Sequence, residues 1–185
     1  MVMRVEDLDP QRSKQMYIDA LFRDYELLGF EWEGSPLFQS TRTEAYKCAF
    51  ETLRDSQHIY ECYCTRADLH SASAPHKGET TIYAGTCRYL SSRERDNLRE
   101  RGRVPAFRIT VPEAEFTIPD IFQGDYSLHL AKECRDFVVR RNDGVYAYQL
   151  AVVVDDDYQD VSNITRAIDL LSSTPQQVFL QHVLG

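Results

Sequence analysis

Apolar side chains recur at steps of three and four residues in the segment 12–28, which predicts an amphipathic helix. The positions that form its apolar stripe are Met16, Leu21, Phe22, Tyr25 and Leu28. Gly29 follows the stripe and can adopt the backbone conformation that commonly ends a helix. We therefore expect a helix that ends at Gly29 and buries one face.

Two further helices are predicted from the residues that would begin them. Thr41 and Glu44 have the spacing of a capping box, so a second helix is expected to start at Thr41. Thr174 is followed by Pro175, which favours the first helical turn, and Gln177 completes a second capping box. The last helix is therefore expected to start near Thr174.

Three strands are predicted in the second half of the chain, at 106–111, 136–141 and 145–154. Residues 142–144 read Asn-Asp-Gly and favour a tight turn between the latter two strands, because these residue types tolerate positive φ. The run 150–154 lacks polar alternation, which is typical of a strand covered on both faces of an α/β sheet. These elements predict an α/β protein.

The chain has 185 residues, 43% of them hydrophobic, and can bury one substantial core. No apolar run approaches the roughly 18 residues of a membrane helix, and the N-terminus resembles no leader peptide, so we expect a soluble, cytoplasmic protein. Five cysteines at irregular spacing suit reduced thiols or a metal site better than disulfides. The segment 71–85 is rich in small and turn-forming residues, which predicts a loop.

The formal net charge of −8 argues against binding of nucleic acid through the overall field of the protein. Any RNA contact would have to be local, and one arginine-rich stretch is a candidate. Its members are Arg88, Arg93, Arg95, Arg99, Arg101, Arg103 and Arg108. Acidic residues interleave with these arginines, so a solvated helix with ion pairs is an equally open interpretation.

Cysteines supply the most specific local pattern. Cys62 and Cys64 form a tight pair, and Cys87 follows across the predicted loop. Zinc favours four tetrahedral ligands with soft thiolates, so three thiols could be offered to one ion. Three small buried hydrophobic side chains are the alternative, which is common for free cysteine. Cys48 and Cys134 are isolated in the sequence and are interpreted as packing residues.

The fourth ligand of such a zinc site is open on the residues alone. The Tyr83 phenol would have to lose its proton to bind, and the ordinary pKa of a tyrosine is about 10. His70 and His76, which lie between Cys64 and Cys87, are chemically easier donors. The chemistry by itself therefore favours a histidine.

Three carboxylates precede the first predicted helix, at Glu6, Asp7 and Asp9. They could hold the ammonium group of a ligand or a metal, or they could complement the positive end of the helix dipole. Taken by itself, the segment favours the helix-dipole interpretation.

A second polar group lies at or beyond the C-terminal end of the predicted buried strand. Its members are Tyr148, Asp155, Asp156 and Arg166. Open α/β sheets usually bind ligands at this edge, so these residues are candidates for a binding site. A solvated loop is the alternative.

Taken together, these segments resemble the glutamate branch of the class I aminoacyl-tRNA synthetases along nearly the whole chain. Residues 4–10 read Arg-Val-Glu-Asp-Leu-Asp-Pro and are similar to the R-x-E-D-x-D-P element of that family. The other matching segments follow in order, at 39–42, the Cys62 and Cys64 pair, 136–140, 148–156 and 169–176. So many ordered motifs make a coincidence improbable.

Within that branch, the cysteine pattern resembles the shorter synthetases that place glutamate on the queuosine base of tRNA(Asp). Zinc-bearing glutamyl-tRNA synthetases tend to end the site with Cys-x-His, whereas Arg88 and Tyr89 follow Cys87 here. The shorter group uses Cys-x-Cys with Tyr-x-x-x-Cys. The resemblance thus implies zinc ligands at Cys62, Cys64, Tyr83 and Cys87. His70 or His76 remains an alternative because the loop 65–82 is longer than usual for the family.

The resemblance also implies an incomplete Rossmann-type catalytic domain with a small zinc-binding insertion. Residues 1–57 and 106–185 would belong to the catalytic domain, and residues 58–105 would form the insertion and a linking helix. A monomer is expected.

Glu6 would hold the α-ammonium of L-glutamate, and Tyr148 and Arg166 would line the pocket, with Arg166 pairing the side-chain carboxylate. The other substrates implied are ATP, with Mg²⁺, and tRNA(Asp) carrying queuosine.

The sequence also departs from the family. The HIGH-type and KMSKS-type ATP motifs would precede Arg4 and follow Gly185, so we expect the isolated chain not to form glutamyl-adenylate. The family's Arg-Gly-Ala-Asp-Leu-Leu reads Arg-Ala-Ile-Asp-Leu-Leu at 166–171, and the β-carbon of Ala167 could crowd the pocket. Two other interpretations remain, a fragment of ordinary glutamyl-tRNA synthetase and a noncatalytic zinc-supported module that binds RNA or a partner.

Overall fold

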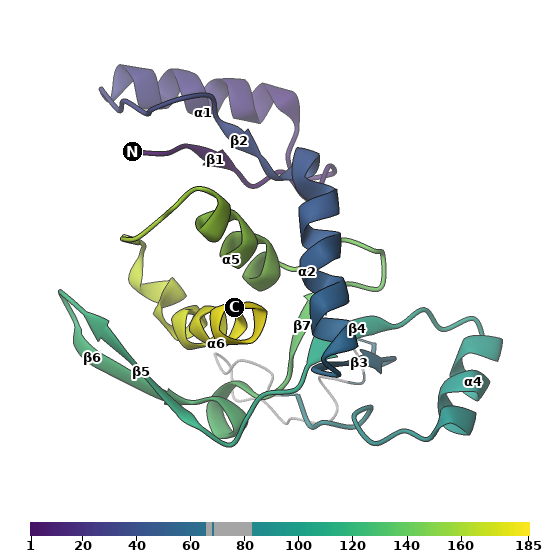
Figure 1. Ribbon diagram of the computed structural model, residues 1–185. Helices are drawn as coiled ribbons and strands as arrows, with labels where there is room; N and C mark the ends of the chain where they lie inside the picture. The colour runs from purple at the N-terminus through teal and green to yellow at the C-terminus, as the bar shows by residue number, and fades with distance from the viewer. Residues whose placement is uncertain (66–67, 69–82) are drawn as a thin grey trace.

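The structure is a computed structural model that describes residues 1–65, 68 and 83–185 (Figure 1). Most of the predicted loop 71–85, together with His70 and His76, lies outside the described residues. In the part that is described, no helix is both long and apolar enough to cross a membrane.

Helices and short strands alternate along the described chain. The α-helices are α1 (Gln15–Leu27), α2 (Thr43–Asp55), α4 (Ser92–Glu100), α5 (Tyr148–Tyr158) and α6 (Thr174–Leu184). Three shorter helical turns are η1 (Gln39–Arg42), η2 (Leu130–Cys134) and η3 (Ile168–Ser173). The strands are β1 (Arg4–Val5), β2 (Leu37–Phe38), β3 (Ile59–Cys62), β4 (Ala106–Ile109), β5 (Glu115–Asp120), β6 (Gly124–His129) and β7 (Phe137–Arg140).

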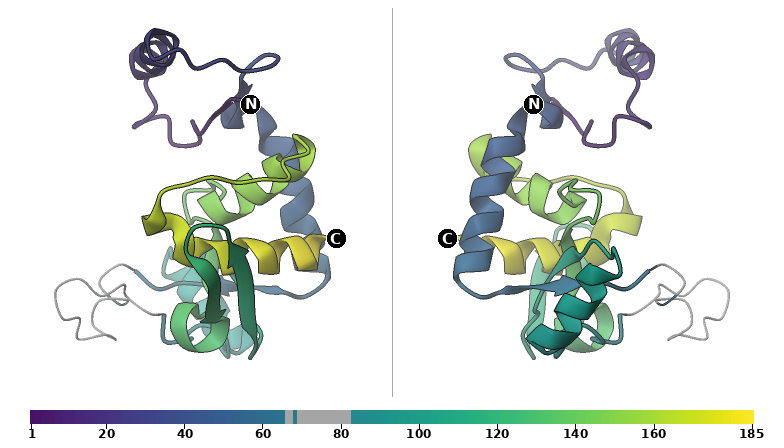
Figure 2. Two further views of the ribbon diagram at one scale, coloured as in Figure 1. Left: turned by 90° about the vertical axis from the view of Figure 1, so that its left-hand side faces the viewer. Right: turned by 90° about the vertical axis from the view of Figure 1, so that its right-hand side faces the viewer.

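The strands form three small sheets. Strand β1 pairs in parallel with β2, and α1 connects them, so the N-terminal segment is a βαβ unit. Strands β3, β4 and β7 form an antiparallel sheet with β4 in the middle. Strands β5 and β6 form a hairpin that lies alongside α6, where Phe116 contacts Phe179 (Figure 2).

The main core lies where α2, α5 and α6 meet the sheet β3–β4–β7 (Figure 1). Its buried residues include Tyr46, Phe50, Leu53, Ile109, Leu130, Val139, Leu150, Ala151, Val153, Phe179 and Leu180. A second, smaller cluster of buried side chains contains Cys62, Tyr63, Tyr83 and Cys87. The candidate metal ligands therefore lie outside the main core, at the end of β3.

The prediction of a strand at 145–154 is wrong, because residues 148–158 form helix α5. Leu150, Ala151, Val152 and Val153 are all buried, so this helix is covered on more than one side. A continuous apolar run fits a buried helix as well as a buried strand, and tertiary packing here overrides the strand preference of the valines. The turn at 142–144 is confirmed, but it leads only to a single bridge between Arg140 and Tyr146.

Helix α1 is confirmed, but the predicted burial of its apolar stripe is wrong for Met16, Leu21 and Leu28, which are exposed. Among the described residues, α1 buries only Ile18. Figures 1 and 2 show α1 at the edge of the molecule, away from α5 and α6, which explains why so little of its surface is covered.

The two predicted capping boxes do not form. Thr41 lies within η1, and its hydroxyl donates to the carbonyl oxygen of Phe38, while α2 starts at Thr43. Helix α6 starts at Thr174 as predicted, without a side-chain cap. The β5–β6 hairpin was not predicted from the sequence.

Asp155 is expected to contribute strongly to the stability of the fold. Its carboxylate is fully buried and accepts hydrogen bonds from three side chains. Gln39 Nε2 lies 3.0 Å and the Tyr46 hydroxyl 2.7 Å from Oδ2, and Arg42 Nε lies 3.2 Å from Oδ1. We expect Asp155→Ala to lower the free energy of unfolding by about 3–5 kcal/mol, since it leaves buried polar partners unpaired. Urea unfolding measures this, with exposed Asp157→Ala as the matched control. Equal stability of the two variants would contradict the prediction.

Candidate functional site

Glu6, Tyr148 and Arg166, which are far apart in the sequence, line one cavity of about 520 Å³. Glu6 directly follows β1, Tyr148 is the first residue of α5, and Arg166 lies in the segment before η3. Other lining residues are Met1, Val2, Arg4, Val152, Asp156, Gln159, Val161, Asn163, Ile164 and Thr165. The three sequence-predicted residues are thus brought together around one space.

Arg4 and Asp156 form the charged wall beside Glu6. Arg4 Nη1 donates to Asp156 Oδ1 at 2.6 Å, and Arg4 Nε lies 3.8 Å from Glu6 Oε1. Burial raises the pKa of the Glu6 carboxyl above its ordinary value, and Arg4 opposes this shift. A carboxylate in such a place gains most from a ligand that brings a positive charge.

A chain of hydrogen bonds through two glutamines orients Arg166, and the sequence analysis selected neither glutamine as a site residue. Arg166 Nη1 donates to Gln177 Oε1 at 2.7 Å, and Gln177 Nε2 donates to Gln149 Oε1 at 2.8 Å. Gln177 is buried, so the chain of hydrogen bonds fixes the guanidinium relative to α5 and α6. The sequence offered Gln177 only as a capping residue, a role that it does not have.

The predicted C-terminal edge of a buried strand does not exist, because residues 148–158 form one helix and its polar residues lie at both ends. Tyr148 is partly exposed at the start of α5, whereas Asp155 and Asp156 lie near the other end of this helix. Asp156 lines the cavity, and Asp155 is buried in its own network. Ala167 is not among the residues that line the cavity, although its neighbour Arg166 is, and the effect of its β-carbon on a bound ligand remains a prediction.

The helix-dipole interpretation of Asp7 and Asp9 is wrong. Helix α1 starts only at Gln15 and has no acidic residue in its first turn. Asp7 instead accepts hydrogen bonds from the backbone N–H and the hydroxyl of Ser40, at 2.8 and 2.6 Å. This contact joins the motifs 4–10 and 39–42 in space, while Asp9 caps a local turn through the N–H of Gln11.

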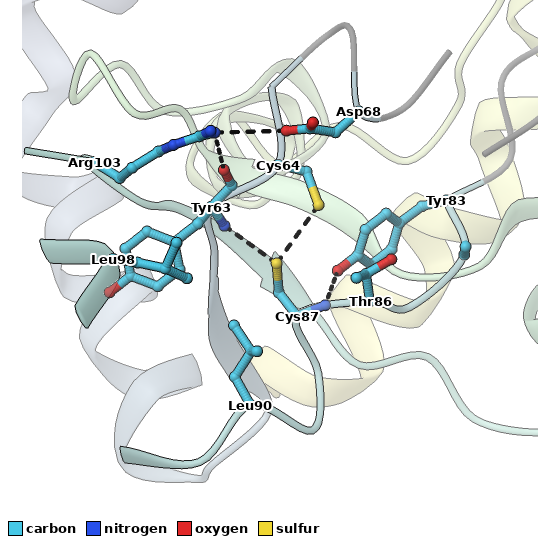
Figure 3. A pocket seen from close by; sticks show the side chains of 10 residues that line it. Tyr63, Cys64, Asp68, Tyr83, Thr86, Cys87, Leu90, Leu98 and Arg103 are labelled. Atoms are coloured by element: carbon cyan, nitrogen blue, oxygen red, sulfur yellow. Dashed lines mark hydrogen bonds and ion pairs between the residues drawn. The ribbon is translucent and has the colours of Figure 1, made fainter. Parts of the chain in front are cut away.

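The three clustered cysteines come together as a possible metal centre. Their sulfur atoms all lie within 4.8 Å of one another, and Cys64 Sγ lies 3.5 Å from Cys87 Sγ. Cys62 ends β3, and Cys87 lies in the turn before α4. Figure 3 shows the Cys64 and Cys87 sulfurs facing each other across a pocket that Tyr83 also lines.

Tyr83, the fourth ligand that the resemblance implies, lies beside two of the three clustered cysteines. Its hydroxyl oxygen accepts a hydrogen bond from the backbone N–H of Cys87 at 2.8 Å and lies 3.7 Å from Cys62 Sγ. Burial raises the pKa of this phenol, so it needs a strong partner to give up its proton. His70 and His76 lie outside the described residues, so the histidine alternative is untested.

The donor set fits a zinc ion chemically. Zinc–sulfur bonds of about 2.3 Å place the sulfurs of a tetrahedral site roughly 3.8 Å apart, which is close to the spacing seen here. A hydrogen bond from Cys87, with Arg108 nearby, lowers the pKa of Cys62 to about 4, whereas the same contact raises the pKa of Cys87. Three thiols this close together favour a cation that would let all of them ionise.

Packing does not explain the two remaining cysteines equally well. Cys48 is exposed on α2, so its prediction as a packing residue is wrong. Cys134 is partly buried, and its sulfur accepts a hydrogen bond from Gln176 Nε2. Neither belongs to the three-cysteine cluster.

The arginine-rich stretch forms helix α4 and its flanks, and ion pairs tie several members. Arg99 donates to Glu61 and to Asp96, at 2.6 and 2.8 Å. Arg108 is buried inside the sheet. Ser91 and Glu94 form a complete capping box at the start of α4. Helix α4 is thus solvated and tied by ion pairs as one interpretation predicted, while a local RNA contact remains untested.

Comparisons with known proteins agree along the whole chain. The family model described as tRNA synthetases class I (E and Q), catalytic domain, matches residues 1–185. The glutamyl-Q tRNA(Asp) synthetases of Pseudomonas fluorescens and Geobacter sulfurreducens are 42% and 41% identical over 184 and 191 residues. Each match covers 100% of this chain, which spans 57% of the relative's length.

Solved structures match the fold. The glutamate-tRNA synthetase of Elizabethkingia anophelis gives a TM-score of 0.84 at 23% identity, covering 100% of this chain and 41% of the other. A glutamate tRNA ligase from Elizabethkingia meningosepticum, in complex with its amino acid, gives 0.83 at 23% identity, covering 100% and 40%. The predicted α/β catalytic-domain fold is thus confirmed, while the domain boundaries at 57 and 105 remain predictions.

Proposed function

The chain belongs to the catalytic-domain family of class I tRNA synthetases for glutamate and glutamine, and from this membership we propose that the protein transfers glutamate to the queuosine base of tRNA(Asp). ATP, with Mg²⁺, would activate the amino acid, and the reaction would take place in the cytoplasm. The observation that carries the proposal is the cavity in which Glu6, Tyr148 and Arg166 meet.

The charges around this cavity suit glutamate. The Glu6 carboxylate would bind the α-ammonium, and the Arg166 guanidinium would bind the side-chain carboxylate through two parallel hydrogen bonds. Gln177 already holds one edge of the guanidinium, which reduces the entropy lost on binding. Tyr148 would form the wall along the carbon chain of the ligand.

The protein's own residues would act by positioning. The α-carboxylate of glutamate attacks the α-phosphate of ATP and releases pyrophosphate, and a hydroxyl of the modified base then attacks the acyl carbon and releases AMP. Glu6 and Arg166, by fixing both ends of the amino acid, would leave the α-carboxylate free to face the nucleotide. No covalent intermediate with the protein is needed.

The cysteine cluster supports the assignment to the queuosine-modifying group. One structural zinc ion would be held by Cys62, Cys64, Tyr83 and Cys87. The Tyr83 hydroxyl already lies next to the Cys62 sulfur and accepts a hydrogen bond from the backbone N–H of Cys87. In ordinary zinc-bearing glutamyl-tRNA synthetases the site tends to end with Cys-x-His. Here Cys87 is followed by Arg88 and Tyr89, so Tyr89 takes the place of the histidine.

Three tRNAs test this function with the protein at its natural length. We expect labelled glutamate to be incorporated into queuosine-containing tRNA(Asp), but not into queuosine-free tRNA(Asp) or into tRNA(Glu). Removing the 3′-terminal adenosine should leave the activity intact, because the acceptor hydroxyl is on the base rather than on the 3′ ribose.

The other outcomes would identify the alternatives. Charging of tRNA(Glu) alone, lost with the 3′ adenosine, would show an ordinary glutamyl-tRNA synthetase. No charging of any tRNA, and no glutamate-dependent ATP–pyrophosphate exchange, would leave a noncatalytic binding module.

A further inference from the structure

Arg108 connects the central strand of the sheet to the cysteine cluster. It lies on β4, and only 8% of its surface is exposed. Its Nε donates to Cys62 Sγ at 3.3 Å, its Nη1 donates to the carbonyl oxygen of Asp136 at 2.8 Å, and its Cζ lies 3.9 Å from the centre of the Tyr83 ring. One side chain thus contacts two candidate zinc ligands and the start of β7.

Asp136 fixes the other side of this arrangement. Its carboxylate accepts hydrogen bonds from the Tyr60 hydroxyl at 2.8 Å and from the N–H of Val111 at 2.9 Å. Arg88 Nη1, one residue after Cys87, lies 3.6 Å from the same carboxylate. Arg108 is therefore held in a rigid frame that spans β3, β4, β7 and the Cys87 turn.

The net charge of the proposed zinc–thiolate group explains why a buried arginine would stabilise it. Three thiolates carry more negative charge than one zinc ion neutralises, and a phenolate would add to the excess. Burying a net negative centre is costly unless a cation compensates it, and a guanidinium keeps its charge and donates in a fixed plane. The partners that orient metal ligands affect metal affinity almost as strongly as the ligands themselves.

We propose that Arg108 is a positioning residue for the zinc centre, holding Cys62 and Tyr83 in place and compensating the charge of the metal–thiolate group. The inference rests on the zinc site of the proposed function. It makes zinc binding depend on a residue of the main sheet.

Zinc affinity tests the proposal, measured on the full chain by competition with a colorimetric chelator. We expect Arg108→Gln to weaken zinc binding by about 10- to 100-fold. Arg108→Lys should weaken it less, because it keeps the charge but loses the planar contacts. The matched control is Arg103→Gln, since Arg103 lines the same pocket but contacts the carbonyl oxygen of Tyr63 and the carboxylate of Asp68 (Figure 3). It should bind zinc like the original protein.

Substitution of Co²⁺ for zinc separates positioning from general stability. We expect Arg108→Gln to change the cobalt–thiolate absorption bands, and Arg103→Gln to leave them unchanged. Unaltered zinc affinity and cobalt bands in Arg108→Gln would overturn the inference while leaving the zinc site intact. Absence of zinc binding by the original protein would overturn the zinc site as well. Should Arg108→Gln fail to fold, Arg108→Lys carries the test, and unchanged affinity and bands would overturn the inference.

Discussion

Replacing Arg166 by glutamine is expected to lower the affinity for L-glutamate by roughly 30-fold to several-thousand-fold. The estimate follows from removing one partner of a hydrogen-bonded charge pair inside a partly closed cavity, which costs about 2–5 kcal/mol. Gln177 Oε1 would also lose the hydrogen bond that the Arg166 guanidinium donates to it at 2.7 Å. Calorimetric titration of the chain with L-glutamate measures the effect directly and needs neither ATP nor tRNA.

Two variants and one ligand control this experiment. Arg166→Lys keeps the charge but loses the planar fork, so its affinity should fall between those of the original chain and Arg166→Gln. Exposed Arg23→Gln on α1 changes the net charge equally and should bind glutamate normally. L-Glutamine lacks the side-chain carboxylate and should bind the original chain weakly. Equal affinities of Arg166→Gln and the original chain would show that Arg166 does not select the ligand.

The convergence of Glu6, Tyr148 and Arg166 was predictable because their motifs occur in a known order. Spacing alone would not have placed them together, since the element that carries Tyr148 is a helix and not the predicted strand. The valine run 152–154 has a strand-forming composition, but Val153 and Val154 pack into the main core, and this tertiary packing overrides the strand preference. Local patterns therefore identified the residues, while tertiary packing decided the element.

Residues that position a site residue, rather than contact the ligand or metal themselves, were not predictable. Gln177 was assigned only to a capping box and Arg108 only to the arginine-rich stretch, and their partners are 11 and 46 residues away in the sequence. Asp136 begins a matched motif, yet its link to Tyr60 and Arg88 depends on the antiparallel register of β3, β4 and β7. The contacts of Arg108 and Asp136 depend on which strands lie next to each other, and local sequence patterns do not reveal this.

The second large effect is expected on loss of zinc. We predict about one equivalent of zinc in the purified chain and almost none in Cys87→Ser, because a structural site that loses one of its thiolates binds far more weakly. The small cluster of Cys62, Tyr63, Tyr83 and Cys87 would then lose its centre. Limited proteolysis near residues 83–90 and a lower melting temperature should follow, while Cys48→Ser, at an exposed cysteine outside the cluster, should keep its zinc.

The same metal analysis decides the fourth ligand. If Tyr83 binds zinc, Tyr83→Phe should lower the affinity and change the cobalt spectrum, whereas His70→Ala and His76→Ala should do neither. Tyr83→Phe keeps the ring that stacks on Arg108, so the comparison isolates the oxygen atom. The reverse result would move the fourth ligand to a histidine and weaken the resemblance to the queuosine-modifying group. Less than half an equivalent of zinc in the original chain would contradict the metal site itself.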